Sequence, residues 1–418
     1  MSDSPQTVAV VGAGIVGVST AIWLQREGHD VILIDREGPA AGASFGNGGV
    51  LASCSVVPVT VPGLLRKAPR MLFDPNQPLF LKWAYVPKLV PWLVKYLGSA
   101  KAETVERRAK AMTPIIGDSL SDHMALAAGT AAERYIVESD YLYLYQDRAH
   151  FESDAFGWRV RADNGFRWET LEDDAWRDYD PSFGPSINFA VKLGNHGRIS
   201  DPGAYVKALA THAEAEGVKF IKANVDDVIS EAGKIVGLRA DGQTISCDRA
   251  VLATGAWSKS LAKKFGLSQP PLESERGYHL ELWEPSVMPR APVMVASGKF
   301  VATPMEGRIR LAGVVEFGGL DALPSRKPFE LLERNIQAAM PGLTWKRTEE
   351  WMGHRPSMAD SIPVIGEAPG LKGSFAAFGH DHIGLTGGPK TGRVLAQLIS
   401  NKNPNLDLSP YSPARFSG

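Results

Sequence analysis

The 418-residue chain is predicted to have an α/β fold (α+β overall) in which a domain with a parallel sheet is interleaved with a second domain. Three observations lead to this prediction. Residues 7–35 combine an apolar run, a glycine motif, a helical pattern and a second apolar run. This alternation of strand and helix stops after residue 57 and returns near residue 197. Another glycine-rich turn, at residues 379–388, precedes the last helical pattern, so the C-terminal part completes the first domain.

The first unit has the sequence pattern of a dinucleotide site. Gly12 permits the tight turn after the first strand, Gly14 lets a pyrophosphate approach the backbone, and Gly17 lets the helix lie close to the sheet. The following helix N-terminus offers unpaired N–H groups and positive dipole to the phosphates. Asp35 ends the second strand and can accept hydrogen bonds from a ribose, which argues against NADP. FAD and NAD remain open at this point.

The composition excludes several classes of protein. With 45 basic and 46 acidic residues, the net charge is −1, so no global field favours nucleic acid or anionic lipid. Cys54 and Cys247 form neither a metal-ligand spacing nor a disulfide framework, so no metal site is expected and a reducing compartment is favoured. No targeting pattern precedes the first strand, and we expect a cytoplasmic protein.

The segment Leu79–Leu97 is the most apolar part of the chain, but it is too interrupted to span a bilayer. The interrupting residues are Lys82, Lys88, Lys95, Pro87 and Pro91. One interpretation is two short helices packed on the protein body. The other is a membrane-surface patch with Trp83 and Trp92 at the interface, which would place the protein peripherally on the inner face of the membrane.

The segment Gly38–Leu51 follows the ribose-binding strand and contains five glycines. Its exposed backbone N–H groups can surround a phosphate or a flat ring. We expect Ser44, Asn47 and Gly48 to lie on the cofactor.

The rest of the chain alternates between the two domains. Helical segments such as Lys101–Met112 and the β-prone run Tyr141–Tyr145 belong to the inserted domain. A helix with Asp201 as N-cap follows, then short strands, and a buried strand that ends in Thr254-Gly255 at the ligand-binding edge of the sheet. We therefore assign residues 1–57, 195–269 and 350–418 to the nucleotide-binding domain and residues 58–194 and 270–349 to a substrate-binding domain.

Five ordered segments carry a resemblance to a known family. They are GAGIVG with Asp35, SFGNGG, ATGAW, HRPSMADSIPVIG and GHDHIGLTGGPKTG. Together they resemble the D-amino-acid oxidase/glycine oxidase-like flavoprotein superfamily, and most closely its bacterial D-amino-acid dehydrogenase branch. The resemblance implies a glutathione-reductase-type Rossmann FAD domain and a substrate domain built on a large antiparallel sheet, with the flavin between them.

The resemblance also implies which residues bind the cofactor. They are Gly12, Gly14, Ile15, Val16, Gly17, Asp35, Arg36, Ser44, Asn47, Gly48, Gly49, Val225, Gly255, Trp257, Gly384, Leu385 and Thr386. Val225 matches a backbone group near the adenine, and the segment from Gly384 matches the pyrimidine end of the flavin. No cysteine follows Cys247, so we expect non-covalent FAD.

Arg355 aligns with the arginine that holds the substrate carboxylate in the family, and a planar guanidinium suits that role because it binds a carboxylate through two parallel hydrogen bonds. The alternative is a structural ion pair, for example with Asp360. Arg276, Tyr278 and His279 align with a strand that contributes a tyrosine to the substrate pocket, although they can equally be sheet residues. His380 aligns with flavin-proximal residues, and we count it with Arg355 and Tyr278 as catalytic.

The implied function is FAD-dependent oxidation of D-amino acids to 2-oxo acids and ammonia. The Cα hydrogen passes as hydride to flavin N5, and the electrons go on to a quinone or another acceptor. Within the fold, the alternative substrate is a secondary amine such as D-proline, a hydroxyproline isomer or an N-methyl amino acid, oxidised with oxygen. A structural flavoprotein and an NAD-dependent dehydrogenase are the other classes, but the chain has no second GxGxxG. The oligomeric state is left open.

Overall fold

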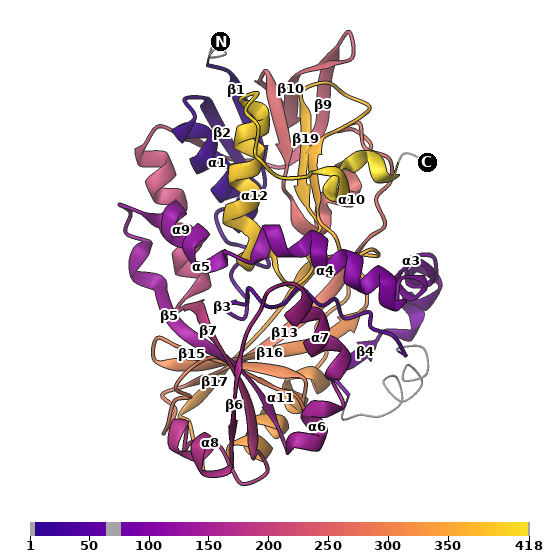
Figure 1. Cartoon of the computed structure of the whole chain (residues 1–418). Coiled ribbons are helices and arrows are strands. Elements are labelled where there is room, and N and C mark those ends of the chain that lie inside the picture. Colours follow the sequence, from indigo (N-terminus) through magenta and orange to yellow (C-terminus); the bar gives the residue numbers. More distant parts are fainter. Residues whose placement is uncertain (1–4, 64–76, 417–418) are drawn as a thin grey trace.

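The computed structural model describes residues 5–63 and 77–416. Its upper part in Figure 1 contains the parallel sheet and its helices, and its lower part contains a large curled sheet. The predicted α/β fold with a large, mainly antiparallel second sheet is confirmed.

The upper sheet is parallel except for one edge strand, β18, which runs antiparallel to β19. In spatial order its strands are β18 (Val364–Glu367), β19 (Ser374–Phe378), β12 (Arg249–Leu252), β1 (Thr7–Val11), β2 (Asp30–Asp35) and β8 (Lys219–Lys222). β1 is buried from Val8 to Val11, as a central strand covered on both faces should be. The first βαβ unit therefore forms where the glycine motif predicts it.

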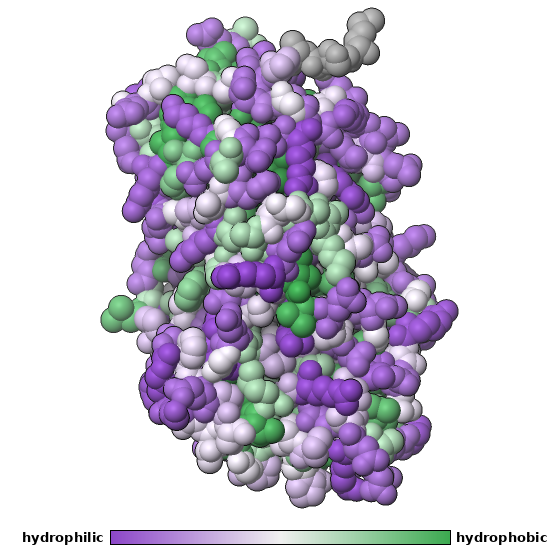
Figure 2. All heavy atoms as spheres, turned by 90° about the vertical axis from the view of Figure 1, so that its left-hand side faces the viewer, coloured by the Kyte–Doolittle hydropathy of each residue, from purple (hydrophilic) through white to green (hydrophobic). Residues whose placement is uncertain are grey.

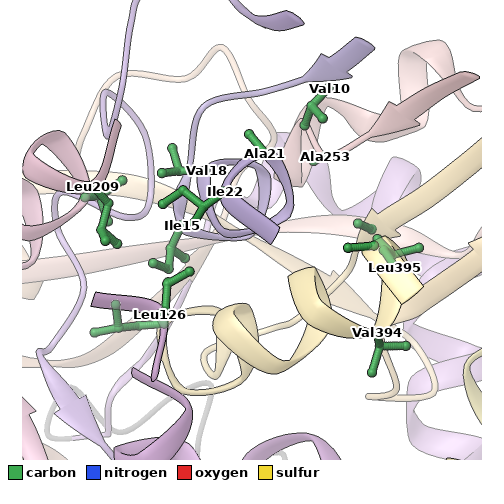
Figure 3. Close-up of a cluster of buried hydrophobic side chains, with 14 of the residues drawn as sticks. Val10, Ile15, Val18, Ala21, Ile22, Leu126, Leu209, Ala253, Val394 and Leu395 are labelled. Carbon is green, nitrogen blue, oxygen red and sulfur yellow. The ribbon is translucent and has the colours of Figure 1, made fainter. Parts of the chain in front are cut away.

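Three long helices pack around one another beside this sheet. They are α1 (Ile15–Arg26), α9 (Pro202–Ala215) and α12 (Gly384–Ile399). Figure 3 shows part of their shared core, which includes Ile22 of α1, Leu209 of α9 and Val394 of α12. A Cβ atom at Gly392 would lie 2.6 Å from the backbone carbon of Ser19, so the glycine permits close contact between α12 and α1.

A small antiparallel sheet is attached to the upper part. Its strands are β9 (Val225–Glu231), β10 (Lys234–Ala240) and β11 (Gln243–Ser246). The turn between β10 and β11 has positive φ angles at Asp241 (46°) and Gly242 (78°). Two such residues in succession match the twist of a tight hairpin.

The large sheet forms the lower part. In order its main strands are β17 (Arg347–Met358), β13 (Leu272–Trp283), β16 (Arg308–Phe317), β15 (Phe300–Met305), β14 (Val293–Val295), β5 (Ile136–Tyr145), β7 (Phe189–Ile199) and β3 (Val50–Leu51). Two short strands pair beside them, β4 (Leu79–Leu81) with β16 and β6 (Glu169–Glu172) with β7.

The central strand β13 is buried on both faces. Tyr278, Leu280 and Leu282 pack in a core with residues of α11 (Lys327–Ala339). Because side chains alternate across a strand, Glu275 and Gly277 lie on the opposite face, towards the upper domain. This alternation decides which residues of the predicted substrate strand can reach a ligand.

Several elements cross the predicted domain limits. β3 belongs to the large sheet although it lies within residues 1–57, β7 crosses the limit at 195, and β17 crosses the limit at 350. Helices α4 (Ala102–Ile116) and α5 (Ser119–Ala127) come from the inserted segment, but both contact α12. In Figure 1, α4 runs across the junction of the two parts. The other α-helices within residues 5–63 and 77–416 are α3 (Val86–Gly98), α6 (Arg148–Glu152), α7 (Ala155–Asp163), α8 (Asp173–Tyr179) and α10 (Ser258–Leu261).

The apolar segment Leu79–Leu97 contains one α-helix and not the two short helices of the first interpretation. It forms β4, one turn of 3-10 helix and α3, in which Pro87 lies in the first turn and Pro91 lies inside the helix. Trp92 is buried and stacks on Tyr96, so it is not the interfacial residue that the sequence suggested. Trp83 is 61% exposed. Binding of this segment to a membrane surface stays a prediction.

The face shown in Figure 2, the left-hand side of Figure 1, is mostly hydrophilic with small, separate apolar patches. Scattered exposed apolar side chains of this kind are normal for a protein surface. Among the described residues, no helix combines the length and apolarity needed to cross a bilayer.

Candidate active site

A continuous cavity of about 1200 Å³ is lined by residues of both parts of the molecule. It extends from the glycine turn after β1 to the strands β13 and β17 of the large sheet. The N-termini of α1 and α12 both border it. Ligand sites of α/β sheets lie at this carboxyl edge, so the cavity is the candidate active site.

The glycine turn is fixed by steric contacts. Gly12 has a φ of 107°, and a Cβ atom there would lie 2.4 Å from the carbonyl oxygen of Ala253. A Cβ atom at Gly17 would lie 1.8 Å from the carbonyl oxygen of Gly12, so α1 can approach β1 only with glycine at that position. Gly14 is the N-cap of α1 and supplies no side-chain cap. The Ile15 N–H is bonded to Ser44 Oγ, and among the described residues no side chain accepts from the next N–H groups of the first turn, which remain available to an anion.

Two side chains hold the turn in position. Ser44 Oγ accepts a hydrogen bond from the Ile15 N–H at 2.9 Å. The Asp35 carboxylate accepts hydrogen bonds from the N–H groups of Ala13 at 2.8 Å and Gly38 at 2.9 Å. Asp35 thus links the two loops around the predicted ribose position and still borders the cavity.

The loop after Ser44 is bound to the large sheet through its carbonyl groups. Arg310 Nη1 donates to the carbonyl oxygens of Phe45 (3.0 Å) and Asn47 (2.6 Å), and Thr303 Oγ1 donates to that of Gly48 (2.6 Å). Arg310 is fully buried and is paired with Glu281 at 2.6 Å. This support could not be foreseen from the sequence, because the pairing of β13 with β16 cannot be read from the spacing of these residues.

The N-terminus of α12 forms the other side of the cavity. Its N-cap, Ile383, supplies no side-chain cap, and Gly384, Leu385 and Thr386 line the cavity. His380 is buried just before it, with Nε2 3.0 Å from Thr391 Oγ1. Burial lowers the pKa of His380 to about 4, so the ring is neutral at pH 7 and holds α12 in place.

These features fit FAD. Two helix N-termini without side-chain caps face one cavity, which suits a pyrophosphate and a ring that becomes negatively charged on reduction. The predicted cofactor residues that line the cavity are Gly12, Gly14, Ile15, Val16, Asp35, Arg36, Ser44, Asn47, Gly48, Val225, Gly255, Trp257, Gly384, Leu385 and Thr386. Gly17 and Gly49 do not line it. Gly17 serves helix packing, and Gly49 lies against Met305 and the Ile199 carbonyl.

Arg355 lines the cavity from β17, directly opposite Glu275 of β13. Its Nη1 donates to Glu275 Oε1 at 2.8 Å, and the two side chains are 20% and 13% exposed. The ion pair that the sequence analysis gave as the alternative role of Arg355 is therefore present, but with Glu275 and not with Asp360, which is paired with Arg415 at 2.9 Å. A Cβ atom at Gly277 would lie 2.6 Å from Arg355 Nε, so the guanidinium lies over the bare backbone of that glycine.

The neighbouring residues of β13 need correction. Arg276 is fully buried and donates to Glu316 (2.6 Å) and to the Ala322 carbonyl (2.6 Å), so it is not placed to bind substrate. Tyr278 borders the cavity, but its hydroxyl donates to Glu316 at 2.7 Å. Burial and this hydrogen bond raise the pKa of Tyr278 to about 12. Both side chains point to the α11 side of the sheet. Their positions in the sequence did not reveal this orientation.

His279 also has a structural role. Its Nδ1 lies 3.0 Å from the Gly46 carbonyl oxygen, and its ring stacks on Trp351 with centroids 5.0 Å apart. Burial, together with Arg310, lowers the pKa of His279 to about 3, so Nδ1 donates from a neutral ring. Trp351 also lines the cavity, but it was not among the predicted site residues. Its place four residues before Arg355 on the same strand could have indicated it.

A further group of polar residues lines or supports the cavity from β5 and α7. Arg161 is buried, donates to the Cys54 carbonyl (3.2 Å) and Tyr143 Oη (3.3 Å), and lies over the rings of Tyr143 and Trp158. Burial alone would raise the pKa of Cys54, but His196 and Arg161 outweigh it and lower that pKa. The residues are far apart in sequence, so no spacing revealed them.

Known proteins similar to this chain identify its family. A family described as FAD dependent oxidoreductase (DAO) matches residues 7–398. D-amino-acid oxidase of Bradyrhizobium diazoefficiens is 41% identical, over 98% of both chains. D-amino acid dehydrogenase of Rhizobium rhizogenes is 29% identical, over 98% of this chain and 99% of the relative.

The solved structures show the same fold. Glycine oxidase from Geobacillus kaustophilus has a TM-score of 0.75 at 22% identity, and covers 98% of this chain and 99% of its own. L-proline dehydrogenase from P. horikoshii has a TM-score of 0.73 at 19% identity, and covers 99% of this chain and 98% of its own. The resemblance seen in the sequence and the predicted fold class are thereby confirmed.

Proposed function

We propose that this chain, which belongs to the family of FAD-dependent oxidoreductases, oxidises a D-amino acid at the α-carbon to a 2-oxo acid and ammonia. FAD is the cofactor. The observation that carries the proposal is the position of Arg355, which faces the same cavity as the two helix N-termini without side-chain caps.

The residues of the chain position the substrate. Arg355 binds the α-carboxylate through charge-assisted hydrogen bonds, and this contact sets the direction of the Cα–H bond. FAD, when bound, would supply the acceptor for the Cα hydrogen as hydride, and the substrate nitrogen would first release its ammonium proton to solvent so that its lone pair can form the imine. The N-terminus of α12 provides a positive dipole beside the cofactor cavity. Water then hydrolyses the imino acid. His380 is neutral and hydrogen-bonded to Thr391, so we assign it to positioning rather than proton transfer.

The names of the relatives support the substrate class. The 41% identical protein is a D-amino-acid oxidase by name, and several relatives near 29% identity are named D-amino acid dehydrogenases. All cover nearly the whole chain. A D-amino acid is therefore favoured over the secondary amines considered from the sequence.

The electron acceptor is a separate part of the proposal. The sequence resemblance led us to expect a quinone, whereas the name of the 41% identical relative supports oxygen. We propose oxygen, and expect the reduced enzyme to be reoxidised faster by air than by a soluble quinone analogue. Faster reoxidation by the quinone analogue in anaerobic buffer would assign a dehydrogenase instead.

An anaerobic substrate panel tests the proposed reaction. The purified yellow protein is mixed with D- and L-amino acids, proline analogues and N-methylated amino acids, and bleaching of the flavin absorbance is followed. We expect a primary D-amino acid to bleach the flavin faster than its L-enantiomer. Bleaching only by secondary amines would assign the alternative substrate class. Failure of every amino acid would contradict the function and favour a structural role for the flavin.

A further inference from the structure

The ion pair of Arg355 and Glu275 combines a positive and a negative group at one place in the cavity wall. The two residues are direct partners in the register of β17 and β13, with Nη1 and Oε1 2.8 Å apart. Both line the cavity, and neither side chain is fully buried. A guanidinium has five N–H donors, and this is the one hydrogen bond that the described residues provide to Arg355.

Arg355 and Glu275 are the main charged groups at this end of the cavity, because burial disfavours the charged forms of three ionisable residues near them. Burial raises the pKa of Asp381 well above its ordinary value, and burial lowers the pKa of His382. Burial likewise raises the pKa of Tyr96 on α3. In each case burial disfavours the charged form of the group. A ligand at this place therefore meets one cation and one anion side by side.

We propose that Glu275 recognises the ammonium group of the substrate while Arg355 binds its carboxylate, so that the ion pair selects a zwitterionic α-amino acid. The inference rests on the proposed function and specifies the class of substrate for the same site. In an α-amino acid the ammonium and the carboxylate are attached to one carbon, and the protein presents the complementary charges on two adjacent strands.

The same ion pair discriminates against carboxylic acids that lack an amine. Such a ligand must share Arg355 with Glu275, and its negative charge then lies beside the Glu275 carboxylate with no cation to compensate. An amino acid brings its own positive charge to Glu275. The negative charge of Glu275 thus strengthens the binding of an amino acid and weakens the binding of a carboxylic acid without an amine.

Gly277 gives the guanidinium the space that this arrangement needs. A Cβ atom there would lie 2.6–2.8 Å from Nε, Cζ and Nη2 of Arg355. Because no side chain stands at this position, the guanidinium can lie against the strand with Nη1 at Glu275.

The alternative is that Glu275 only positions Arg355. In that case, removal of its charge would weaken the binding of every carboxylate, with or without an amine. The two roles therefore predict opposite signs for a ligand that lacks the amine, and this difference is measurable.

The test uses the FAD-loaded protein and the variant Glu275→Gln, which keeps the size and the hydrogen-bond acceptor but removes the charge. The ligands are the best amino acid of the substrate panel and its analogue without the amine, for example D-alanine and propionate. KM is measured for the amino acid, and the dissociation constant of the analogue is measured by isothermal titration calorimetry. Glu275→Ala is measured in parallel in case the glutamine takes over the hydrogen bond.

We expect KM for the amino acid to rise about 10-fold or more, as for the loss of a charge-assisted hydrogen bond, and the analogue to bind at least several-fold more tightly. The matched control is Glu273→Gln, two residues along β13, where the carboxylate accepts from Tyr85 Oη at 2.9 Å; both constants should stay within about 2-fold of wild type.

Weaker binding of both ligands, or no change in either, would overturn the inference. These outcomes are distinct from failure of the proposed function, in which no amino acid would bleach the flavin of the wild-type protein.

Discussion

Arg355 is the residue on which the proposed reaction depends, and its position is set by the glycine that faces it. The guanidinium lies over Gly277 and is held by Glu275 on one side. The sequence identified Arg355 through the HRPSMADSIPVIG segment, but it did not identify the glutamate or the glycine, because both act through a strand pairing between residues about 80 positions apart.

The first prediction concerns Gly277→Ala. The new Cβ would collide with the end of the Arg355 side chain, which is flexible and can move, so the fold and bound flavin should be kept. The guanidinium would be displaced, and we expect KM for the amino acid to rise about 10-fold or more. Steady-state kinetics and the flavin spectrum check this. Gly342→Ala is the control, since a Cβ atom there meets nothing within 4 Å and the kinetics should not change.

Glu281 leads to a prediction on pH. Burial raises its pKa, but the guanidinium groups of Arg310 and Arg308 outweigh burial, so the net pKa lies below the ordinary value of 4.5. A carboxylate with a lowered folded-state pKa stabilises the protein fully above its unfolded pKa and loses that contribution as the pH falls through the folded value. Glu281→Gln should therefore lower Tm near pH 7 and weaken the fall of Tm with acidification below about pH 4.5. A fall parallel to that of wild type would contradict this role.

At the level of elements, the contact of α1 with α12 joins the first and the last nucleotide-binding segments. Gly392→Ala would place a Cβ atom 2.6 Å from the Ser19 backbone carbon and 2.7 Å from the Thr20 nitrogen, and backbone atoms cannot easily move. We expect a loss of about 1–3 kcal/mol in the free energy of unfolding, seen as a lower Tm. Gly98→Ala at the end of α3, where the new methyl group meets no atom within 4 Å, should be neutral or slightly stabilising. Equal Tm values for the two variants would show that the helices can separate without cost.

The sequence predicted the βαβ elements well, but it did not predict which strands pair in the large sheet. The reason is physical. The strands β1 and β2 of the upper sheet are short apolar runs next to Gly12 and Asp35, and their turn residues lie beside them in the chain. The cofactor cradle follows directly from Gly12, Gly14 and Asp35. The strands of the large sheet pair over long distances in sequence. For this reason, the contacts of Arg310 to the loop after Ser44 could not be foreseen, and neither could the extension of β17 across the predicted domain limit at residue 350.

At the level of the whole molecule, the cavity is lined by residues of both parts, so a cofactor bound there would contact elements of both. A ligand that binds only the folded protein stabilises it, by about 4 kcal/mol at 1,000 times its Kd. Removal of FAD should therefore lower Tm, and added FAD should restore it. NAD serves as the control and should not raise Tm, since the chain has no second GxGxxG. An apoprotein as stable as the holoprotein would mean that the cavity walls hold together without the cofactor.

The central claim is that Arg355 anchors an amino acid for oxidation by the bound flavin. The most direct test is rapid mixing of wild type and Arg355→Ala with the best D-amino acid under anaerobic conditions, with the rate of flavin bleaching followed against substrate concentration. We predict that the variant keeps its yellow flavin but loses about 3 kcal/mol or more of transition-state binding, which is about 100-fold or more in kcat/KM. The same concentration dependence in both proteins would contradict the account.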